Sequence, residues 1–256
     1  MNIVVLLKQT FDTEAKVALK DGKIDSAEVT LIINPYDEYA IEEALKLKEA
    51  NGGEVTIVST GGEKVEQAIR TGLAMGADKA ILVTDPALEE VDEWAAAELI
   101  AKALGDVEYD IILGGRVAID DGSSQVAERV AEVLGIPSVT SILKLDIADS
   151  TATVTREIDG GQEIIEVPLP ALFTAQKGLN EPRLPNMMGI MKAKSKPLDK
   201  KDLAAVGTSA ADVAAKFIIS EVSLPAPRTA GTILKGEAAD NAKELARLLR
   251  EEAKVI

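Results

Sequence analysis

The chain of 256 residues contains no cysteine and no histidine. The absence of cysteine excludes disulfides and thiolate chemistry. The absence of histidine removes the commonest metal ligand and the usual general base near neutral pH. Only carboxylate, lysine, hydroxyl and backbone groups remain for chemistry. The sequence therefore predicts neither catalytic residues nor a metal site.

Long apolar runs and an excess of positive charge are also missing. No run approaches the roughly 18 apolar residues that span a membrane, and the early IVVLL is too short for the apolar part of a signal peptide. The net charge of −15 argues against nucleic-acid binding, which needs a basic surface, and fits ordinary solubility. We expect a cytoplasmic protein with no transmembrane segment and no nucleic-acid partner.

The first half of the chain alternates aliphatic runs with amphipathic stretches. Unbroken aliphatic runs are typical of strands buried on both faces of a parallel sheet, and they occupy Ile3–Leu7, Val55–Val58, Ala80–Val83 and Ile111–Leu113. Helical spacing of apolar residues occurs between them, over Tyr36–Ala50, Val65–Met75, Glu93–Leu104 and Gln125–Leu134, the last ending at Gly135. This alternation predicts an α/β fold with an open, mostly parallel sheet and flanking helices.

The apolar period changes after Ile142. Three alternating runs, Leu143–Ile147, Thr151–Ile158 and Glu163–Leu169, predict an antiparallel hairpin region over 142–170. From residue 184 the chain is interrupted by prolines and ends in a helical pattern near Asp240–Ala253. A tail of this length rarely remains a free loop. We expect an α/β domain over 1–183, which includes the hairpin region, and an extended tail over 184–256 that wraps around a partner.

The segment GGRVAIDDGSSQV, residues 114–126, lies between a predicted strand and a predicted helix. Ligands of open parallel sheets bind beyond the carboxyl ends of the strands. Here the first two glycines permit close backbone approach, Arg116 supplies a charge, and residues 122–124 lie where helix amides hold phosphates. Asp120 and Asp121 would repel a phosphate beside them, so they are expected to hold the loop backbone or face ribose hydroxyls. The alternative is an ordinary capped turn.

Other nucleotide signals are weak or missing. The turns at Asn34–Asp37 and Thr60–Gly62 are predicted at the same sheet edge, but each is a common turn sequence. Neither G-x-G-x-x-G after a strand nor a P-loop motif occurs, so ordinary dinucleotide and P-loop sites are not supported.

A basic loop follows the hairpin region. Residues 177–201 hold seven Lys or Arg but only two acids, Glu181 and Asp199. This loop is either solvated or a partner contact in which charge steers the encounter. Leu179 is either an apolar anchor of a transient interface or a core leucine. Arg156 and Glu157, at the hairpin turn, are either partner contacts or a surface ion pair of little energy.

One stretch carries a family signature. Residues 154–191, VTREIDGGQEIIEVPLPALFTAQKGLNEPRLPNMMGIM, followed by KAKSK, resemble the electron transfer flavoprotein beta (small) subunit. The segments IVVLLKQ, NPYDEYAIEEALKLKE, AIRTGLAMGADKAILV and GGRVAIDDGSSQ are similar to that family in the same order. The resemblance covers nearly the whole chain and weakens over about the last forty residues.

The resemblance implies an electron carrier subunit, not an enzyme, in which residues 1–183 form a nucleotide-binding domain. It implies a large (alpha) subunit that holds FAD, and acyl-CoA-type or other flavin dehydrogenases as electron donors. A stand-alone nucleotide-binding sensor is the more distant alternative. The resemblance also implies a nucleotide pocket lined by Leu6, Asn34, Pro35, Tyr36, Asp37, Thr60, Gly115, Arg116, Asp120, Asp121, Gly122, Ser123, Ser124, Gln125 and Val126. It implies partner docking by Leu179, which enters a pocket on the dehydrogenase, and by Arg156 and Glu157, near the large subunit's flavin domain.

The nucleotide in this pocket is either a second FAD, as in family members that can split electron pairs, or AMP with a structural role. The sequence AIDD is shared with AMP-holding members. The small residues that follow, GSSQVA, and AERVAEVLGIP are more similar to two-flavin members, whereas Trp94–Ala97 lacks the threonines that many of those have. Small side chains leave room for a pyrophosphate along the helix N-terminus. We therefore favour FAD, with AMP as the alternative.

Overall fold

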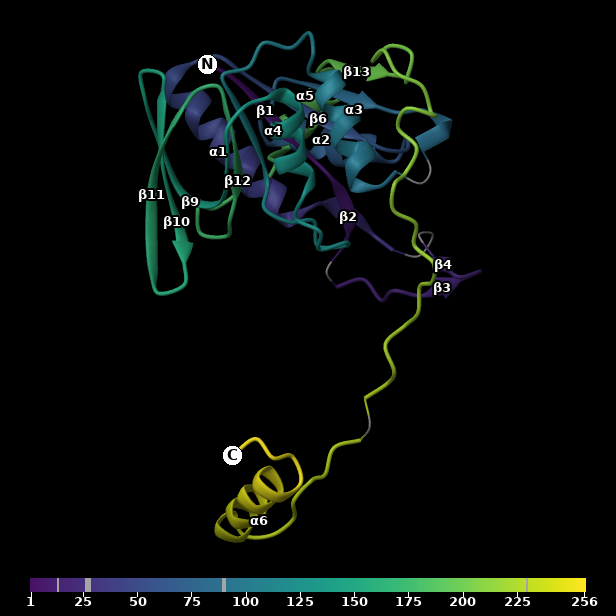
Figure 1. Cartoon of the computed structure of the whole chain (residues 1–256), viewed down its shortest axis with the longest axis vertical. Coiled ribbons are helices and arrows are strands. Elements are labelled where there is room, and N and C mark those ends of the chain that lie inside the picture. Colours follow the sequence, from purple (N-terminus) through teal and green to yellow (C-terminus); the bar gives the residue numbers. More distant parts are fainter. Residues whose placement is uncertain (13, 26–28, 89–90, 229) are drawn as a thin grey trace. The chain divides into compact units, whose positions relative to one another are not determined.

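The computed structural model describes residues 1–12, 14–25, 29–88, 91–228 and 230–256 (Figure 1). The chain forms two compact units, residues 1–221 and residues 222–256. Within the described residues, none of the helices combines the length and the apolar character that crossing a membrane requires.

The first unit is built on a mixed sheet with the strand order β11-β10-β9-β12-β8-β1-β6-β7-β13. Its parallel part consists of β1 (Asn2–Leu6), β6 (Glu54–Thr60), β7 (Lys79–Val83), β8 (Ile111–Gly115), β12 (Ala171–Ala175) and β13 (Leu198–Lys201), with β9 (Ser138–Ala148) pairing in parallel to β12. The four strands expected from aliphatic runs are all present, and the predicted α/β fold is confirmed.

Helices cover both faces of this sheet. One core packs α1 (Pro35–Asn51) and α2 (Val65–Met75) against alternate residues of β1, namely Ile3 and Val5. The other packs α3 (Glu93–Ala103) and α4 (Val126–Leu134) against Val4 and Leu6. Because β1 is buried on both sides, it has no polar alternation, which is why its sequence is an unbroken aliphatic run.

The helix ends follow from local chemistry. Gly135 ends α4 in the left-handed conformation with φ 67°, and its N–H donates to the carbonyl of Ala131. This is the position where glycine avoids the steric penalty of a side chain, so the expected stop is confirmed.

The predicted antiparallel meander is also present. Strands β9, β10 (Thr151–Ile158) and β11 (Gly161–Pro168) pair in antiparallel fashion and form a long hairpin region at one end of the sheet (Figure 1). One face buries Ala152 and Val154, while Thr153 and Thr155 are more exposed. This alternation produced the period of two in the sequence.

Two small antiparallel pairs and one short helix lie outside the main sheet. Strand β2 (Gln9–Phe11) pairs with β5 (Leu31–Ile33), β3 (Leu19–Lys20) pairs with β4 (Lys23–Ile24), and η1 (Pro86–Leu88) follows β7.

The boundary between the units lies after Glu221, whereas the sequence suggested a tail from residue 184. Helix α5 (Met187–Ala193) packs on α2, and β13 pairs in parallel with β7, so both belong to the first unit. The second unit contains α6 (Ala238–Glu251), which confirms the helix expected near Asp240–Ala253. Wrapping of the tail around a partner stays a prediction.

Candidate functional site

The carboxyl ends of the central strands meet at one edge of the sheet. The parallel register pairs Leu6 with Val58 and Val5 with Leu113, so β1, β6 and β8 end side by side. The loops that follow these strands, together with the N-terminus of α1, therefore converge. This arrangement brings the predicted residues Leu6, Thr60 and Gly115 to the same edge.

A buried carboxylate, Asp37, joins three of these segments. Its Oδ2 accepts the backbone N–H of Lys8 at 2.7 Å, and its Oδ1 accepts the Gly115 N–H at 2.9 Å and Asn34 Nδ2 at 2.9 Å. Burial raises the pKa of Asp37 to about 7, although these three hydrogen bonds favour its ionised form. Asp37 is thus a central connection of the site.

Asn34 fixes the loop that follows β8. Its Nδ2 also donates to the carbonyl of Val117 at 2.9 Å, and its Oδ1 accepts the N–H of Ile119 at 3.3 Å. Asn34 occupies the N-cap position of α1, and Pro35 follows at the first helical position, where its fixed φ and missing N–H are well tolerated. The predicted turn is therefore a helix start that also binds the neighbouring loop.

Lys8 forms ion pairs with both acidic residues of the same loop. Its Nζ lies 2.8 Å from Asp120 Oδ1 and 2.6 Å from Asp121 Oδ2. Burial lowers the pKa of Lys8, but hydrogen bonds with the two carboxylates outweigh it and raise that pKa. Asp121 Oδ1 accepts the N–H of Ser123 at 2.7 Å. Asp120 and Asp121 thus hold the loop backbone, which is the first of the two roles expected for them.

Sequence reasoning missed Lys8 as a site residue. The available signal was its place directly after the strand IVVLL, at the carboxyl edge of the sheet.

Gly115 lets the first turn of α1 pack closely against the end of β8. A Cβ atom here would lie 2.3 Å from Asp37 Oδ1 and 2.7 Å from Tyr36 Cβ. The close approach expected from the sequence is therefore made by the first turn of α1. Arg116 lies over the Tyr36 ring, with its guanidinium carbon 5.7 Å from the ring centroid, which is a cation–π arrangement.

The segment before α4 provides no side-chain cap for the N-terminus of this helix. Gly122 has φ 67°, and no described atom lies within 4 Å of a Cβ built on it. Ser124 also has a positive φ, 50°. Gln125 occupies the N-cap position, and its Oε1 accepts from Arg129 Nε at 2.8 Å instead of capping the helix. The first amides of α4, beginning at Val126, thus have no side-chain cap among the described residues.

Thr60 supplies a further signal for a ligand. Its Oγ1 is buried at the carboxyl end of β6 and has no hydrogen-bond partner in the described part of the chain. Buried polar groups normally have a partner in the working protein. This orphaned hydroxyl and the uncapped α4 amides fit a polar ligand with phosphate groups.

The predicted docking residues are in different settings. Leu179 is half-buried and packs against the core shared by α1 and α2. Leu184, five residues later, is 89% exposed. The exposed apolar residue of this loop is therefore Leu184.

Arg156 and Glu157 do not pair with each other. Arg156 Nε lies 2.7 Å from Glu163 Oε2, because the two residues are cross-strand partners on β10 and β11. Glu157 is exposed. Both residues lie within β10 and precede the turn.

Comparisons with known proteins identify the family of this chain. The family model described as electron transfer flavoprotein domain matches residues 21–206. The chain is 50% identical to the electron transfer flavoprotein subunit beta of Bacillus subtilis, over 100% of both chains. It is 48% identical to that of Syntrophomonas wolfei, over 100% of this chain and 98% of the relative. It is 38% identical to the mitochondrial subunit beta of Arabidopsis thaliana, over 100% of both. The chain therefore belongs to the electron transfer flavoprotein beta subunit family.

Proposed function

We propose that this chain is the small subunit of a cytoplasmic, heterodimeric electron transfer flavoprotein. The observation that carries this proposal is the identity over the whole chain with beta subunits of that family. Together with a large (alpha) subunit it carries electrons from dehydrogenases to an acceptor, and it is not itself an enzyme. Bound flavin supplies the redox chemistry, while the protein supplies position and electrostatics.

The candidate site holds an adenine nucleotide in this proposal. The α4 amides and helix dipole favour a negative phosphate group, and the Thr60 hydroxyl supplies a buried polar contact. Lys8 reduces the repulsion from Asp120 and Asp121 that would otherwise oppose a phosphate. The remaining lining residues are those that the family resemblance implies.

We favour FAD over AMP in this pocket because the small residues after Asp121 are similar to those of two-flavin members and leave room for a pyrophosphate along the helix N-terminus. Acid extraction of the co-expressed heterodimer, followed by chromatography, separates the two cases. Two FAD per heterodimer support a second flavin and make flavin-based electron bifurcation possible. One FAD with one AMP shows that the pocket holds a structural nucleotide.

Gly122→Phe tests the place of the pocket. We expect the variant to lose the small-subunit nucleotide and to keep the large-subunit flavin. Gly160→Phe is the matched control, since Gly160 also has a positive φ with no described atom near its Cβ position, but lies at the hairpin turn. Loss of the large-subunit flavin from Gly122→Phe alone would show that the site assignment is wrong.

A large subunit is expected to cover the apolar segment 217–219. Asp92 Oδ2 accepts the backbone N–H groups of Lys216 and Phe217 at 2.5 and 2.9 Å, which fixes the start of this segment. Phe217, Ile218 and Ile219 are nevertheless exposed, Ile218 by 83%. Contiguous exposed apolar side chains mark interaction surfaces. Ile218→Asp should therefore reduce recovery of the large subunit in co-purification, whereas Glu221→Ala, nearby and polar, should not.

We propose that dehydrogenases dock on helix α5 and on the loop that precedes it. Leu184, Met187, Met188 and Met191 are exposed there, and we call these four residues the docking face. Methionine side chains adapt to different partners, and the basic residues of 177–201 steer acidic partner surfaces. The anchor expected at Leu179 is assigned to Leu184 in this proposal, since Leu179 packs on the core.

Two alanine variants of the heterodimer separate these roles, with an acyl-CoA dehydrogenase as electron donor. Leu184→Ala should raise the KM for the heterodimer and leave its unfolding midpoint unchanged. Leu179→Ala should lower stability by about 2 kcal/mol, because it truncates a half-buried leucine. If Leu184→Ala leaves the KM unchanged, the docking face is assigned wrongly.

A further inference from the structure

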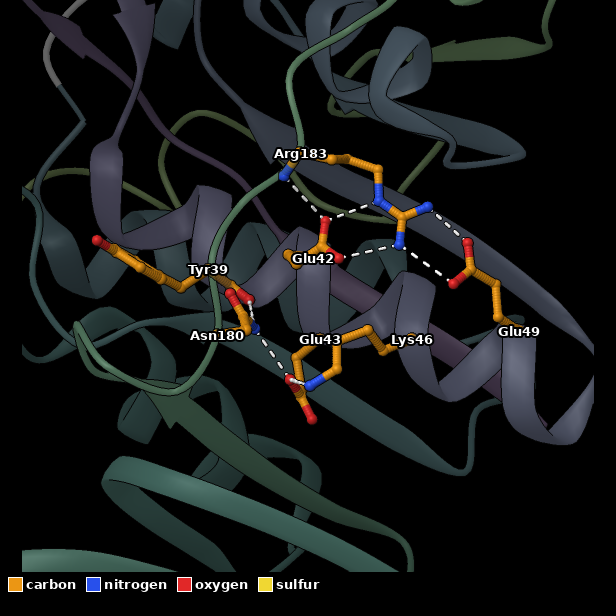
Figure 2. A network of polar contacts seen from close by, with 7 residues as sticks. All are labelled: Tyr39, Glu42, Glu43, Lys46, Glu49, Asn180 and Arg183. Atoms are coloured by element: carbon orange, nitrogen blue, oxygen red, sulfur yellow. Dashed lines mark hydrogen bonds and ion pairs between the residues drawn. The ribbon is translucent and has the colours of Figure 1, made fainter.

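The loop that leads into the docking face is tied to α1 by a polar network (Figure 2). The guanidinium of Arg183 forms a bidentate pair with Glu42, with Nε 2.8 Å from Oε2 and Nη2 2.9 Å from Oε1. The backbone N–H of Arg183 also donates to Glu42 Oε2 at 3.1 Å. Because the side chain of Glu42 is only 8% exposed, one nearly buried carboxylate fixes both the backbone and the side chain of Arg183.

The outer side of the same guanidinium is held by Glu49, two helical turns further along α1. Arg183 Nη1 lies 2.5 Å from Glu49 Oε1, and Nη2 lies 3.2 Å from Oε2. Hydrogen bonds first to Glu42 and then to Glu49 raise the pKa of Arg183. The side chain of Glu49 is 58% exposed, so solvent screens its interaction more than that of Glu42.

Asn180 makes a second connection three residues earlier in the loop. Its Nδ2 donates to the carbonyl of Tyr39 at 3.0 Å and to Glu43 Oε2 at 2.9 Å (Figure 2). Lys46 Nζ lies 3.1 Å from the same Glu43 oxygen, which keeps this nearly buried carboxylate paired. The loop is thus held on α1 at two places.

The other end of the docking face is fixed on α2. A Cβ atom at Gly189 of α5 would lie 2.3 Å from the carbonyl oxygen of Ala74, so the two backbones are in close contact. Lys196 Nζ donates to the carbonyls of Leu73 and Ala77 at 2.9 and 2.5 Å, at the end of α2. Only residues 184–188 separate the two fixed ends, and these include the exposed Leu184.

We propose that Glu42 and Arg183 are positioning residues that hold the docking face in its binding conformation before a dehydrogenase arrives. This inference rests on the proposed function, in which the docking face receives the electron donor. Ordering a loop on binding reduces affinity, so a loop ordered beforehand binds more tightly. The planar guanidinium matches a carboxylate with two parallel hydrogen bonds, which a lysine cannot reproduce.

The test uses the intact heterodimer and an acyl-CoA dehydrogenase as electron donor. Arg183→Lys and Glu42→Gln should each raise the KM for the heterodimer by roughly 10-fold and change kcat by less than about twofold. Hydrogen exchange of residues 180–186 should become faster in both variants. The nucleotide content and the rate of flavin reduction by dithionite should not change, because neither requires docking. Glu49→Gln is the matched control and should change the KM by less than about twofold.

The double variant Glu42→Gln/Arg183→Lys should have nearly the same KM as each single variant, because both break one interaction. Additive effects would overturn the inference. The inference would also be overturned if Arg183→Lys and Glu42→Gln speed up the exchange of residues 180–186 but leave the KM unchanged, while Leu184→Ala raises the KM. An unchanged KM in Leu184→Ala would instead contradict the proposed docking face. Glu42→Gln preserves the side-chain volume and one acceptor oxygen, so the KM test remains decisive if Arg183→Lys does not fold.

Discussion

The pH dependence of stability should report directly on Asp37. Its carboxyl has a pKa of about 7 in the folded chain, against an ordinary value of 3.8, because burial disfavours the charge. Between these two values the folded state binds more protons at Asp37 than the unfolded state does. The free energy of unfolding therefore falls as the pH rises through this window, and the contribution of Asp37 is constant below and above it.

The size of the effect follows from the two pKa values. A difference between about 7 and 3.8 corresponds to about 4 kcal/mol over the whole window. Between pH 5 and pH 7 the loss is about 2 kcal/mol. Asp37→Asn removes the titrating group, but it also replaces one carboxylate oxygen with an NH2 group. This NH2 group then faces another donor, such as the Lys8 N–H. This mismatch costs about 1–3 kcal/mol and does not depend on pH in that range.

Urea unfolding of the wild-type chain and of Asp37→Asn at constant ionic strength measures this difference. Since the other titrating groups are common to both proteins, the difference between the two free energies isolates Asp37. The wild type should lose about 2 kcal/mol relative to the variant from pH 5 to pH 7. Parallel curves would refute the reasoning and would mean that the three hydrogen bonds to the carboxylate balance its burial.

Three further predictions concern the edge of the sheet and the partner surface. Gly115→Ala should destabilise the chain by about 2 kcal/mol in urea unfolding, because its Cβ overlaps Asp37 and Tyr36. Gly62→Ala is the control and should change stability little, since the space around Gly62 is open. Equal unfolding midpoints for the two variants would contradict this packing. Thr60→Val should leave stability unchanged or slightly higher and should weaken nucleotide retention in the heterodimer, since it removes the orphaned hydroxyl; undiminished retention would exclude that hydroxyl as a contact. Residues 217–219 should exchange amide hydrogens more slowly once the large subunit binds, and equal exchange would place the interface elsewhere.

Much of the fold could be predicted from the sequence, because burial determines the spacing of apolar residues along the chain. Val65–Met75 was predicted from helical spacing and is the observed extent of α2. The four aliphatic runs became parallel strands because both of their faces are covered by helices. Strand β13 gave no such signal, because LDKK lies at the sheet edge and joins the sheet by backbone pairing with β7.

The candidate site could be predicted only as a set of loops. The sequence indicated that Asn34–Asp37 and the segment 114–126 belong to one edge, since carboxyl ends of parallel strands meet there. It did not indicate that Asp37 accepts the N–H of Gly115, which lies 78 residues away, or that Lys8 pairs with both Asp120 and Asp121. Such hydrogen bonds leave no periodic trace along the chain.

The class of fold, the family resemblance and the sheet edge that holds the candidate site thus follow from the sequence alone, because they depend on local spacing and on contiguous motifs. Which residues are exposed and which are held by ion pairs becomes clear only in the folded chain. The fold buries part of Leu179 and exposes Leu184, and it joins Arg183 to Glu42 across 141 residues. The physical reason is that solvent exposure and ion pairing depend on packing between distant segments, which appears only when the sheet and its helices assemble.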